Sequence, residues 1–333
     1  MMKLDIMQAV MATVDSEWHC PLADQLAGQW PHDPGQVWFW RVSANFVFVY
    51  KHGGQDFILR FNHASERTAA QIVAELAYVN ALAERGIRVA RPIPSLAGNL
   101  IESVSTTLGE FHAVVFEKLP GEQLEVDDLS GEQFNRWGRA LAALHEAATQ
   151  IEVTGRSTWQ DQLAFVAATV PAAESVIHQA VDRTATALQK LPITPQNYGL
   201  IHYDFELDNL IWHNGQPGII DFDDCTWSWF AADIALALGD LIGESAHALD
   251  LQNEAFQQFL AGYRAIRAMN DAALHHLPLF IQAANLYTFA RLYRALTPVN
   301  EAGELPWMAG LRDKLAAKMA FIRDDLARGL PES

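Results

Sequence analysis

Three polar side chains within one short segment have the types and the spacing that phosphoryl transfer to a hydroxyl needs. Asn209 follows Asp204 by five residues, and Asp221 follows Asp204 by seventeen. In such a reaction one carboxylate orients the attacking hydroxyl and accepts its proton, while a second carboxylate and an amide oxygen hold Mg²⁺ against the phosphates. Mg²⁺ keeps several of its waters, so one Asp and one Asn from the protein are enough. Polar residues at this spacing inside apolar strands would be costly without a function.

The segment that carries these residues reads as a short β-rich island. LIHYDF is followed by NLIWHNGQPGIIDFDD, which turns at Asn214-Gly215. Asn-Gly between two apolar runs is a strong hairpin signal. Asp221 then lies on the return strand, and the two strand ends come close together. This arrangement can place all three side chains around one phosphate.

The rest of the chain separates into a β-rich part and a helical part. Residues 37–61 are rich in Val, Phe, Trp and Tyr, which predicts the first strands of an antiparallel sheet. Residues 64–85 have apolar spacings of three and four and end at Gly86, which predicts an amphipathic helix with a glycine stop. Leu-Pro-Gly at residues 119–121 has the character of a hinge, and the chain after it is mostly helical.

A family resemblance rests on motifs that extend over most of the chain. His-x-Asp-x4-Asn at residues 202–209, followed by a strand that ends in IDFDD, resembles the aminoglycoside phosphotransferase and choline kinase superfamily, the small-molecule branch of the protein kinase-like fold. In detail FILRF, the helix after it and IDFDD are most similar to the homoserine-kinase and stress-response-kinase subgroup. Further matching positions are Asn45, Leu59-Arg60, Glu75, LAALH at 141–145 and Ala232–Ala235.

The resemblance implies a bilobal, protein kinase-like α+β fold and a kinase that uses ATP and Mg²⁺. Asp204 would be the catalytic base, and Asn209 and Asp221 would be the Mg²⁺ ligands. The expected divisions are an N-terminal nucleotide-covering lobe, a hinge, and a C-terminal catalytic and acceptor-binding lobe, at residues 1–115, 116–120 and 121–333.

The resemblance also assigns an arginine to the phosphates of the nucleotide. Arg60 would replace the usual strand lysine, with Glu75 as its ion-pair partner; Glu66 and Glu84 are competing helix acids. Arg is a longer, planar and always charged group, so the exchange is not neutral. It can still contact phosphate in a bidentate way.

Two backbone segments are expected to contact the nucleotide as well. Glu117 and Leu119, in the hinge, would offer backbone groups to adenine. Ser43 and Asn45 lie in the turn that corresponds to a phosphate loop, but this turn contains no glycine and the chain has no G-x-G-x-x-G motif there. Backbone groups can approach a phosphate at such a turn less freely than glycine would allow.

The acceptor is expected to be a small molecule with a hydroxyl group. After Asp221 the chain leads almost directly into the Asp233 helix, which leaves no room for a long activation segment that docks a protein substrate. Aromatic side chains can hold an amine through cation–π contact, and an arginine can bind the carboxylate of a homoserine-like acceptor. The candidate acceptor-binding residues are Asp223, Trp227, Tyr287 and Arg291.

Three other polar residues are interpreted as structural. His202 is predicted to support the backbone of the catalytic loop through hydrogen bonds. Asp233 is predicted to brace the same loop as an acceptor, and His145 to be a core histidine whose hydrogen bonds are satisfied.

Composition excludes several classes of partner. Asp and Glu number 40 against 23 Lys and Arg, a net charge of -17, which does not suit a nucleic acid or an anionic membrane. Cys20 and Cys225 form neither a disulfide framework nor a four-cysteine zinc site. With no signal-peptide pattern and no apolar run long enough to cross a bilayer, we expect a cytoplasmic protein. The sequence leaves the oligomeric state open.

Other functions stay possible at this level. A Ser/Thr protein kinase of the stress-response type would share the motifs. A catalytically silent nucleotide-binding protein would fit the glycine-free turn, although the intact Asp204 argues against it. A metal hydrolase built on His202 and Asp204 lacks paired histidine ligands.

Overall fold

The computed structural model describes residues 1–297 and 305–329 of the chain. The described residues divide into two compact units. The N-terminal unit takes the described residues of Met1–Asn80, Ala90–Lys118 and Arg291–Lys318, and the C-terminal unit takes those of Ala81–Val89, Leu119–Ala290 and Met319–Ser333. The change between Lys118 and Leu119 falls inside the predicted hinge. Residues 81–89 and 291–318 are grouped differently from the predicted lobes, whose boundaries stay a prediction.

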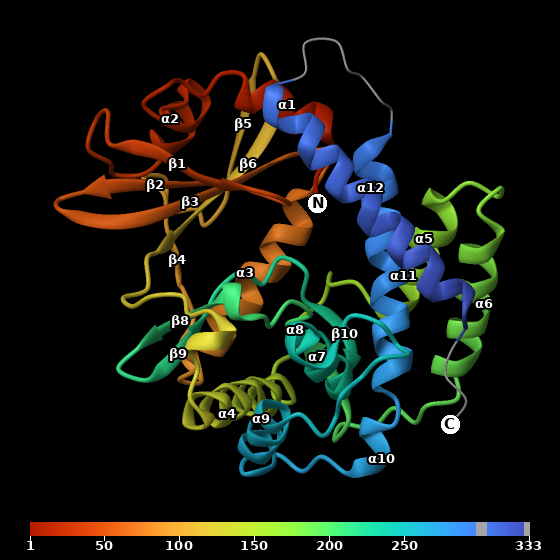
Figure 1. Ribbon diagram of the computed structural model, residues 1–333. Coiled ribbons are helices and arrows are strands. Elements are labelled where there is room, and N and C mark those ends of the chain that lie inside the picture. The colour runs from red at the N-terminus through yellow and green to blue at the C-terminus, as the bar shows by residue number, and fades with distance from the viewer. Residues whose placement is uncertain (298–304, 330–333) are drawn as a thin grey trace. The chain divides into compact units, whose positions relative to one another are not determined.

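Helices and strands are named in chain order (Figure 1). The strands are β1 (Val37–Val42), β2 (Phe46–His52), β3 (Gln55–His63), β4 (Pro92–Ile93), β5 (Glu102–Thr106), β6 (Gly109–Glu117), β7 (Tyr198–Ile201), β8 (Leu210–His213), β9 (Gln216–Ile219) and β10 (Thr226–Trp229). The first helices are α1 (Leu4–Met11), α2 (Pro21–Ala27), α3 (Ala69–Glu84), α4 (Gly131–Ala148), α5 (Trp159–Thr169) and α6 (Ser175–Leu188). The later helices are α7 (Phe230–Ala237), α8 (Gly239–Ile242), α9 (Glu254–Arg264), α10 (Asp271–Leu274), α11 (Leu277–Leu296) and α12 (Pro306–Ala327), and short 3₁₀ turns occur at Val126–Asp128 and Leu207–Asn209.

A six-stranded antiparallel sheet with the order β1-β2-β3-β6-β4, in which β5 pairs with β6, forms the N-terminal unit. The strands predicted within residues 37–61 are therefore confirmed. Phe46 and Phe61 stack at 5.1 Å within a buried cluster that also takes in side chains of α1 and α2. Because successive side chains of a strand point to opposite faces, Arg60 and Asn62 lie on the face of β3 opposite to Phe61.

Two helices of the C-terminal unit cross at glycines. A Cβ atom on Gly138 of α4 would lie 1.9 Å from the carbonyl oxygen of Phe259, and one on Gly262 of α9 would lie 1.9 Å from that of Asn135. The two helix backbones are therefore in direct contact. The predicted apolar stripe of the first helix is buried and comprises Phe134, Trp137, Leu141 and Leu144.

Two short antiparallel ribbons, β7 with β10 and β8 with β9, carry the segment singled out in the sequence. The β8–β9 turn is Asn214-Gly215, with φ angles of 52° and 70°, as a type I′ hairpin requires. Ile201 pairs with Thr226 and Leu210 pairs with Ile219. Residues 202–209 and 220–225 thus connect the same two ribbons, and the topology brings these connections together.

The helix predicted over residues 64–85 begins later than expected, at Ala69. Thr68 and Gln71 form a reciprocal cap: the Thr68 N–H donates to Gln71 Oε1 at 3.0 Å, and the Gln71 N–H donates to Thr68 Oγ1 at 3.3 Å. Within residues 1–297 and 305–329, no helix combines the length and the apolar character needed to cross a membrane.

Candidate active site

The backbone of the catalytic loop, residues 202–209, is held by a buried aspartate of α7. Asp233 is fully buried, and its carboxylate accepts the N–H of His202 at 2.9 Å and the N–H of Tyr203 at 2.8 Å. These bonds fix the peptide groups that precede His202 and Tyr203, at the start of the catalytic loop. The interpretation of Asp233 as a brace for the loop is confirmed.

His202 links the catalytic loop to the segment that contains Asp221. Its Nε2 donates to the carbonyl of Ile220 at 3.0 Å, and its Nδ1 accepts the N–H of Asp204 at 3.3 Å. This pattern corresponds to the Nε2–H tautomer. The predicted structural role of His202 is confirmed, and because both ring nitrogens are used, the residue does not suit a metal hydrolase.

The two polar atoms of the Asn209 side-chain amide have different surroundings: the nitrogen faces the base, and the oxygen is available to a cation. Its Nδ2 donates to Asp204 twice, to the carbonyl oxygen and to Oδ2, both at 2.9 Å. Its Oδ1 is buried and has no hydrogen-bond partner in the part of the chain that the structure describes. A buried acceptor without a partner is unfavourable. A hard divalent cation would satisfy this oxygen, so the residue fits the predicted Mg²⁺ site.

Asp221 is joined to the catalytic loop through the peptide groups of Ile220. The Ile220 N–H donates to the carbonyl of Asn209 at 3.0 Å, and its carbonyl accepts from His202. Asp221 follows at once, and the two predicted metal ligands are therefore on adjoining backbone. Among residues 1–297 and 305–329 there is no group of three or more His, Cys, Asp or Glu arranged for a metal ion.

Two residues of the site have a left-handed backbone conformation. Tyr203 has a φ of 72° and Asp221 a φ of 64°. Such a conformation costs a non-glycine residue about 1 kcal/mol or more, and it persists only where the surroundings enforce it. Here the Tyr203 N–H donates to the Asp233 carboxylate, and the Ile220 peptide groups before Asp221 bond to the carbonyl of Asn209 and to His202. This strain therefore falls on the residue directly before the base and on the second carboxylate residue.

A buried histidine orients Asp233 in turn. His145 lies fully buried with its Nε2 3.0 Å from Asp233 Oδ2 and its Nδ1 2.8 Å from the hydroxyl of Tyr263. Burial lowers the pKa of His145, and the hydrogen bond to Asp233 opposes that shift. Burial raises the pKa of Tyr263, so its hydroxyl donates to Nδ1 while the histidine donates to Asp233. The prediction of a satisfied core histidine is confirmed.

Arg156 holds the turn that follows Asp221, and the sequence analysis did not identify it. Its Nε donates to the carbonyl of Cys225 at 2.9 Å, and its Nη2 donates to the carbonyl of Asp223 at 2.5 Å. The segment after it pairs with β10, where the Trp227 N–H donates to Ser157. No motif signals such a role, because the contacts are to backbone.

The predicted ion pair of the N-terminal unit is present. Arg60 Nη2 and Glu75 Oε2 are 2.7 Å apart, and the two side chains are 6% and 2% exposed. The guanidinium also lies 5.0 Å from the centre of the Phe116 ring. Glu66, a competing candidate, pairs instead with Arg294 at 2.6 Å. The contact of Arg60 with phosphate stays a prediction.

The predicted hinge contacts are more restricted than the sequence suggests. The Glu117 N–H donates to the carbonyl of Arg91 at 2.9 Å, so this group is already used within the protein. Leu119 packs its side chain on β9, where a Cβ on Gly218 would lie 2.8 Å from Leu119 Cδ1. Adenine binding by these two residues stays a prediction.

The acceptor candidates occupy different places in the structure. Tyr287 meets the catalytic loop, since its ring lies 6.0 Å from that of Tyr203 in an edge-to-face arrangement. Arg291 follows it one turn later on α11. Asp223 is buried at 6% exposure, and Trp227 is half-buried in β10. Their roles stay predictions.

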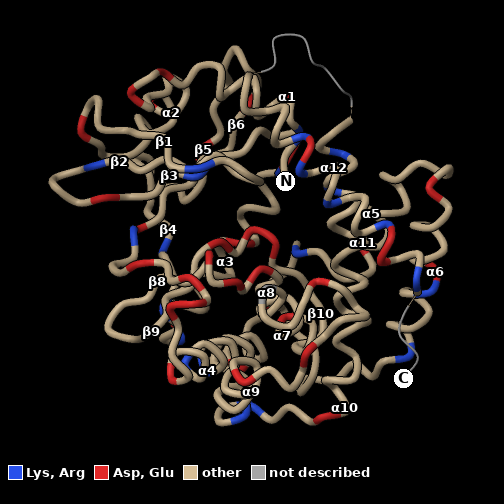
Figure 2. Tube along the Cα trace, viewed as in Figure 1, with Lys and Arg blue, Asp and Glu red and all other residues tan. Residues whose placement is uncertain are grey.

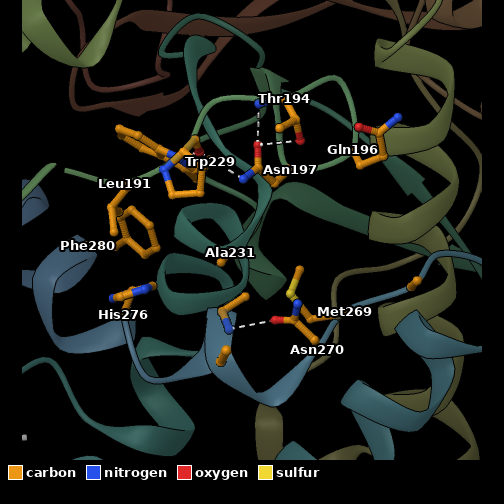
Figure 3. A pocket seen from close by; sticks show the side chains of 14 residues that line it. Leu191, Thr194, Gln196, Asn197, Trp229, Ala231, Met269, Asn270, His276 and Phe280 are labelled. Carbon is orange, nitrogen blue, oxygen red and sulfur yellow. Dashed lines mark hydrogen bonds between the residues drawn. The ribbon is translucent and has the colours of Figure 1, made fainter. Parts of the chain in front are cut away.

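A cavity of about 410 Å³ in the C-terminal unit lies away from this site (Figure 3). It is lined by Trp229 and Asn197 at the end of the β7–β10 ribbon remote from Ile201. The Asn197 amide bonds to Thr194 and Pro192, as Figure 3 shows in part, and the Trp229 indole donates to Pro192 at 2.9 Å. These polar groups are satisfied within the chain, and the cavity does not belong to the catalytic loop.

A loop with a braced aspartate, an amide that bonds to it and a second aspartate on adjoining backbone is the arrangement of phosphotransferases. The model of the family described as "Phosphotransferase enzyme family" matches residues 41–269. The chain belongs to this family.

Individual relatives give more detail. Amicoumacin kinase of Bacillus subtilis (strain 168) is 27% identical over 317 residues, which are 92% of this chain and 91% of that protein. Homoserine kinase of Granulibacter bethesdensis is 28% identical over 293 residues, 83% of this chain and 88% of that protein. A structure of amicoumacin kinase hAmiN in complex with AMP-PNP, Ca²⁺ and Ami has a TM-score of 0.79 at 26% identity, with 97% and 96% of the two chains covered. A microcompartment-associated aminopropanol kinase has a TM-score of 0.67 at 24% identity, with 91% and 96% covered, and supports the fold.

Several predictions are confirmed at this level. The family is the predicted one, and the α+β fold has a β-rich N-terminal and a helical C-terminal part. The chain is a phosphotransferase that acts on an alcohol group. The cofactor prediction, ATP with a divalent metal ion, is confirmed, since the similar amicoumacin kinase holds AMP-PNP and Ca²⁺.

Proposed function

We propose that this phosphotransferase moves the γ-phosphoryl group of ATP, with Mg²⁺, to the hydroxyl of a small molecule that also carries an amine. The observation that supports the chemistry best is the amide of Asn209. Its Nδ2 donates to the carboxylate of Asp204 at 2.9 Å, while its buried Oδ1 has no hydrogen-bond partner among the described residues. One side chain thereby orients the base and presents a hard oxygen to a cation.

Asp204 is the proposed base. Asn209 restricts its carboxylate to one orientation, from which it accepts the proton of the hydroxyl during in-line attack. Asn209 Oδ1 and the carboxylate of Asp221 would hold Mg²⁺, which when bound neutralises charge on the phosphates. Arg60, kept in place by Glu75, would contact the phosphates that are not transferred.

An amine on the acceptor is supported by the local charge. Acidic residues recur along the chain (Figure 2), and residues 204–224 contain six of them without one Lys or Arg. Such a segment attracts cations. Homoserine and aminopropanol, the acceptors in the names of two similar proteins, each combine a hydroxyl with an amine. Tyr287 offers an aromatic ring beside Tyr203 for cation–π contact; Asp223, Trp227 and Arg291 remain further candidates.

A small acceptor is favoured over a protein by the path of the chain after Asp221. Residues 226–229 form β10, which is paired with β7 along its length, and α7 begins at Phe230. The chain between Asp221 and α7 therefore has no room for an activation segment that docks a protein substrate. The Ser/Thr protein kinase is therefore the second candidate and is distinguished by assay.

The base is tested by Asp204→Asn, with Asp208→Asn as the matched control. Asp208 is an exposed carboxylate of the same loop. We expect Asp204→Asn to lower turnover by about 10²-fold or more, because the general base is lost, while Mg-nucleotide binding measured by calorimetry is kept. Asp208→Asn should retain turnover. Equal turnover of the wild type and Asp204→Asn would refute the assignment.

The acceptor class is tested by ADP release in a screen of amino alcohols, homoserine, choline, aminoglycosides and general protein acceptors. We expect release with at least one amine-bearing small molecule. Release with protein acceptors alone would favour the protein kinase. Nucleotide binding without release in any reaction would favour a catalytically silent protein.

A further inference from the structure

The turn between β1 and β2 has a defined conformation although it contains no glycine. It consists of Ser43, Ala44 and Asn45, between strands that end at Val42 and begin at Phe46. The Ser43 N–H donates to the carbonyl of Asn45 at 3.1 Å, and the Met2 N–H donates to the carbonyl of Ser43 at 3.2 Å. Hydrogen bonds thus hold this turn in a defined conformation, in place of the flexible glycines of a phosphate loop.

One side chain of β3 adds two hydrogen bonds to this turn. Asn62 is buried at 2% exposure, and its Nδ2 donates to the carbonyl of Ala44 at 3.1 Å and to Oδ1 of Asn45 at 2.6 Å. The amide nitrogen has two hydrogens, and each serves one of these bonds. Asn45 is likewise buried at 3% exposure. A buried amide with both donors engaged fixes the turn with little freedom.

The orientation of this amide controls the direction of the turn's backbone. The carbonyl and the N–H of one trans peptide point in opposite directions. Because the Ala44 carbonyl points to Asn62, the N–H of the same peptide, that of Asn45, points away from it. Asn62 therefore determines which side of the turn presents an N–H group.

The same face of β3 carries the arginine proposed for the phosphates. Arg60 and Asn62 are two residues apart on one strand, so both side chains lie on one face. Arg60 is anchored there by Glu75 at 2.7 Å. β3 thus fixes a cationic group through its ion pair and the turn through its amide, both within the N-terminal unit.

We propose that Asn62 is a positioning residue for the phosphates of ATP: it locks the glycine-free turn Ser43–Asn45 so that its backbone is set to receive them. The proposal rests on the proposed function and deepens it. It explains how a turn that lacks glycine can serve a nucleotide, since the backbone needs no left-handed freedom once its direction is fixed.

The test measures the binding of AMP-PNP with Mg²⁺ and of adenosine by calorimetry, together with steady-state kinetics, on the full chain. Asn62→Ala removes the amide, and Asn62→Leu keeps its approximate size, lacks both donors and adds no charge. Asn99→Ala is the matched control, because Asn99 is an exposed asparagine of the same unit whose amide donates to Glu102. We expect both Asn62 variants to weaken AMP-PNP about tenfold through the loss of the two hydrogen bonds. Adenosine affinity should stay within about twofold of the wild type, because adenosine has no phosphate.

In steady-state kinetics the Asn62 variants should have a higher KM for ATP than the wild type and an unchanged KM for the acceptor. Equal weakening of adenosine and AMP-PNP would assign Asn62 a merely structural role and overturn the proposal. If Asn62→Ala fails to fold, Asn62→Leu, which preserves the packing volume without adding a charge, decides the question. If the wild type and both Asn62 variants bind AMP-PNP with equal affinity, this proposal is refuted and the proposed function is not. A wild type that binds no nucleotide would refute the proposed function as well.

Discussion

At the scale of single residues, Asn209 shows how few groups the chemistry needs. One amide bonds to the carboxylate of Asp204 through its nitrogen and leaves its oxygen for a cation. The spacing of Asp204, Asn209 and Asp221 was readable in the sequence because a short hairpin fixes their separation locally. Arg156 could not be found in this way, since its guanidinium bonds to carbonyls 67 and 69 residues further along the chain.

The buried His145 leads to a prediction about pH. Burial lowers its pKa in the folded protein below the ordinary value of 6.5, so the unfolded chain binds the proton more readily. Folding stability is then lost as the pH falls through 6.5, by at most about 1.4 kcal/mol per pH unit from this one group.

We expect the free energy of unfolding of the wild type to drop between about pH 7 and pH 5.5, and that of His145→Gln to drop less, as measured by denaturant titration. The control is His213→Gln, because His213 is exposed and its replacement should leave the pH dependence unchanged. An identical pH dependence for wild type and His145→Gln would contradict the prediction.

At the scale of elements, local signals were informative where the chain makes local contacts. The Asn214-Gly215 turn and the stripe of α4 follow directly from turn chemistry and periodicity. The start of α3 is also marked in the sequence, because Thr68 and Gln71 have the spacing of a capping box. The helix predicted over residues 64–85 nevertheless begins before this capping box. The Arg60–Glu75 pair came from resemblance, since nothing local distinguishes Glu75 from Glu66.

The crossing of α4 and α9 gives a prediction about stability. Gly138→Ala should destabilise the protein by about 2 kcal/mol or more, because the new methyl group would meet the backbone of Phe259. Gly310→Ala is the control: Gly310 lies in α12, where, apart from the adjoining residues and the helix's own nearby backbone, no atom of the described residues is within 4 Å of an added Cβ. The exchange should be neutral or stabilise by up to about 1 kcal/mol. Chemical denaturation of both variants provides the comparison, and equal effects would show that the helix contact tolerates a side chain.

At the scale of the whole molecule, sequence separation limits what can be predicted. The described residues of Arg291–Lys318 belong to the N-terminal unit, and Arg294 pairs with Glu66, 228 residues away in the chain. No periodicity or composition could indicate such a partner. The net charge of -17, by contrast, is a property of the sequence alone, and its effect on binding can be measured.

An acidic protein should bind a cationic acceptor less well as salt screens the attraction. We expect the KM of an amine-bearing acceptor to rise several-fold between about 50 and about 300 mM salt, while the KM of a neutral acceptor of similar size stays nearly constant. Initial rates at saturating ATP measure both. A KM that does not depend on salt would argue against an acceptor cation.

The left-handed conformation of Asp221, with a φ of 64°, has a consequence for protein engineering. Glycine adopts this conformation without strain and asparagine tolerates it well, so either residue suits the backbone at this position better than aspartate does. Libraries selected for heat resistance alone would therefore be expected to accumulate glycine or asparagine at position 221 and lose the carboxylate proposed to hold the metal. Any such selection should be coupled to a screen for turnover, because at this position durability and chemistry favour different amino acids.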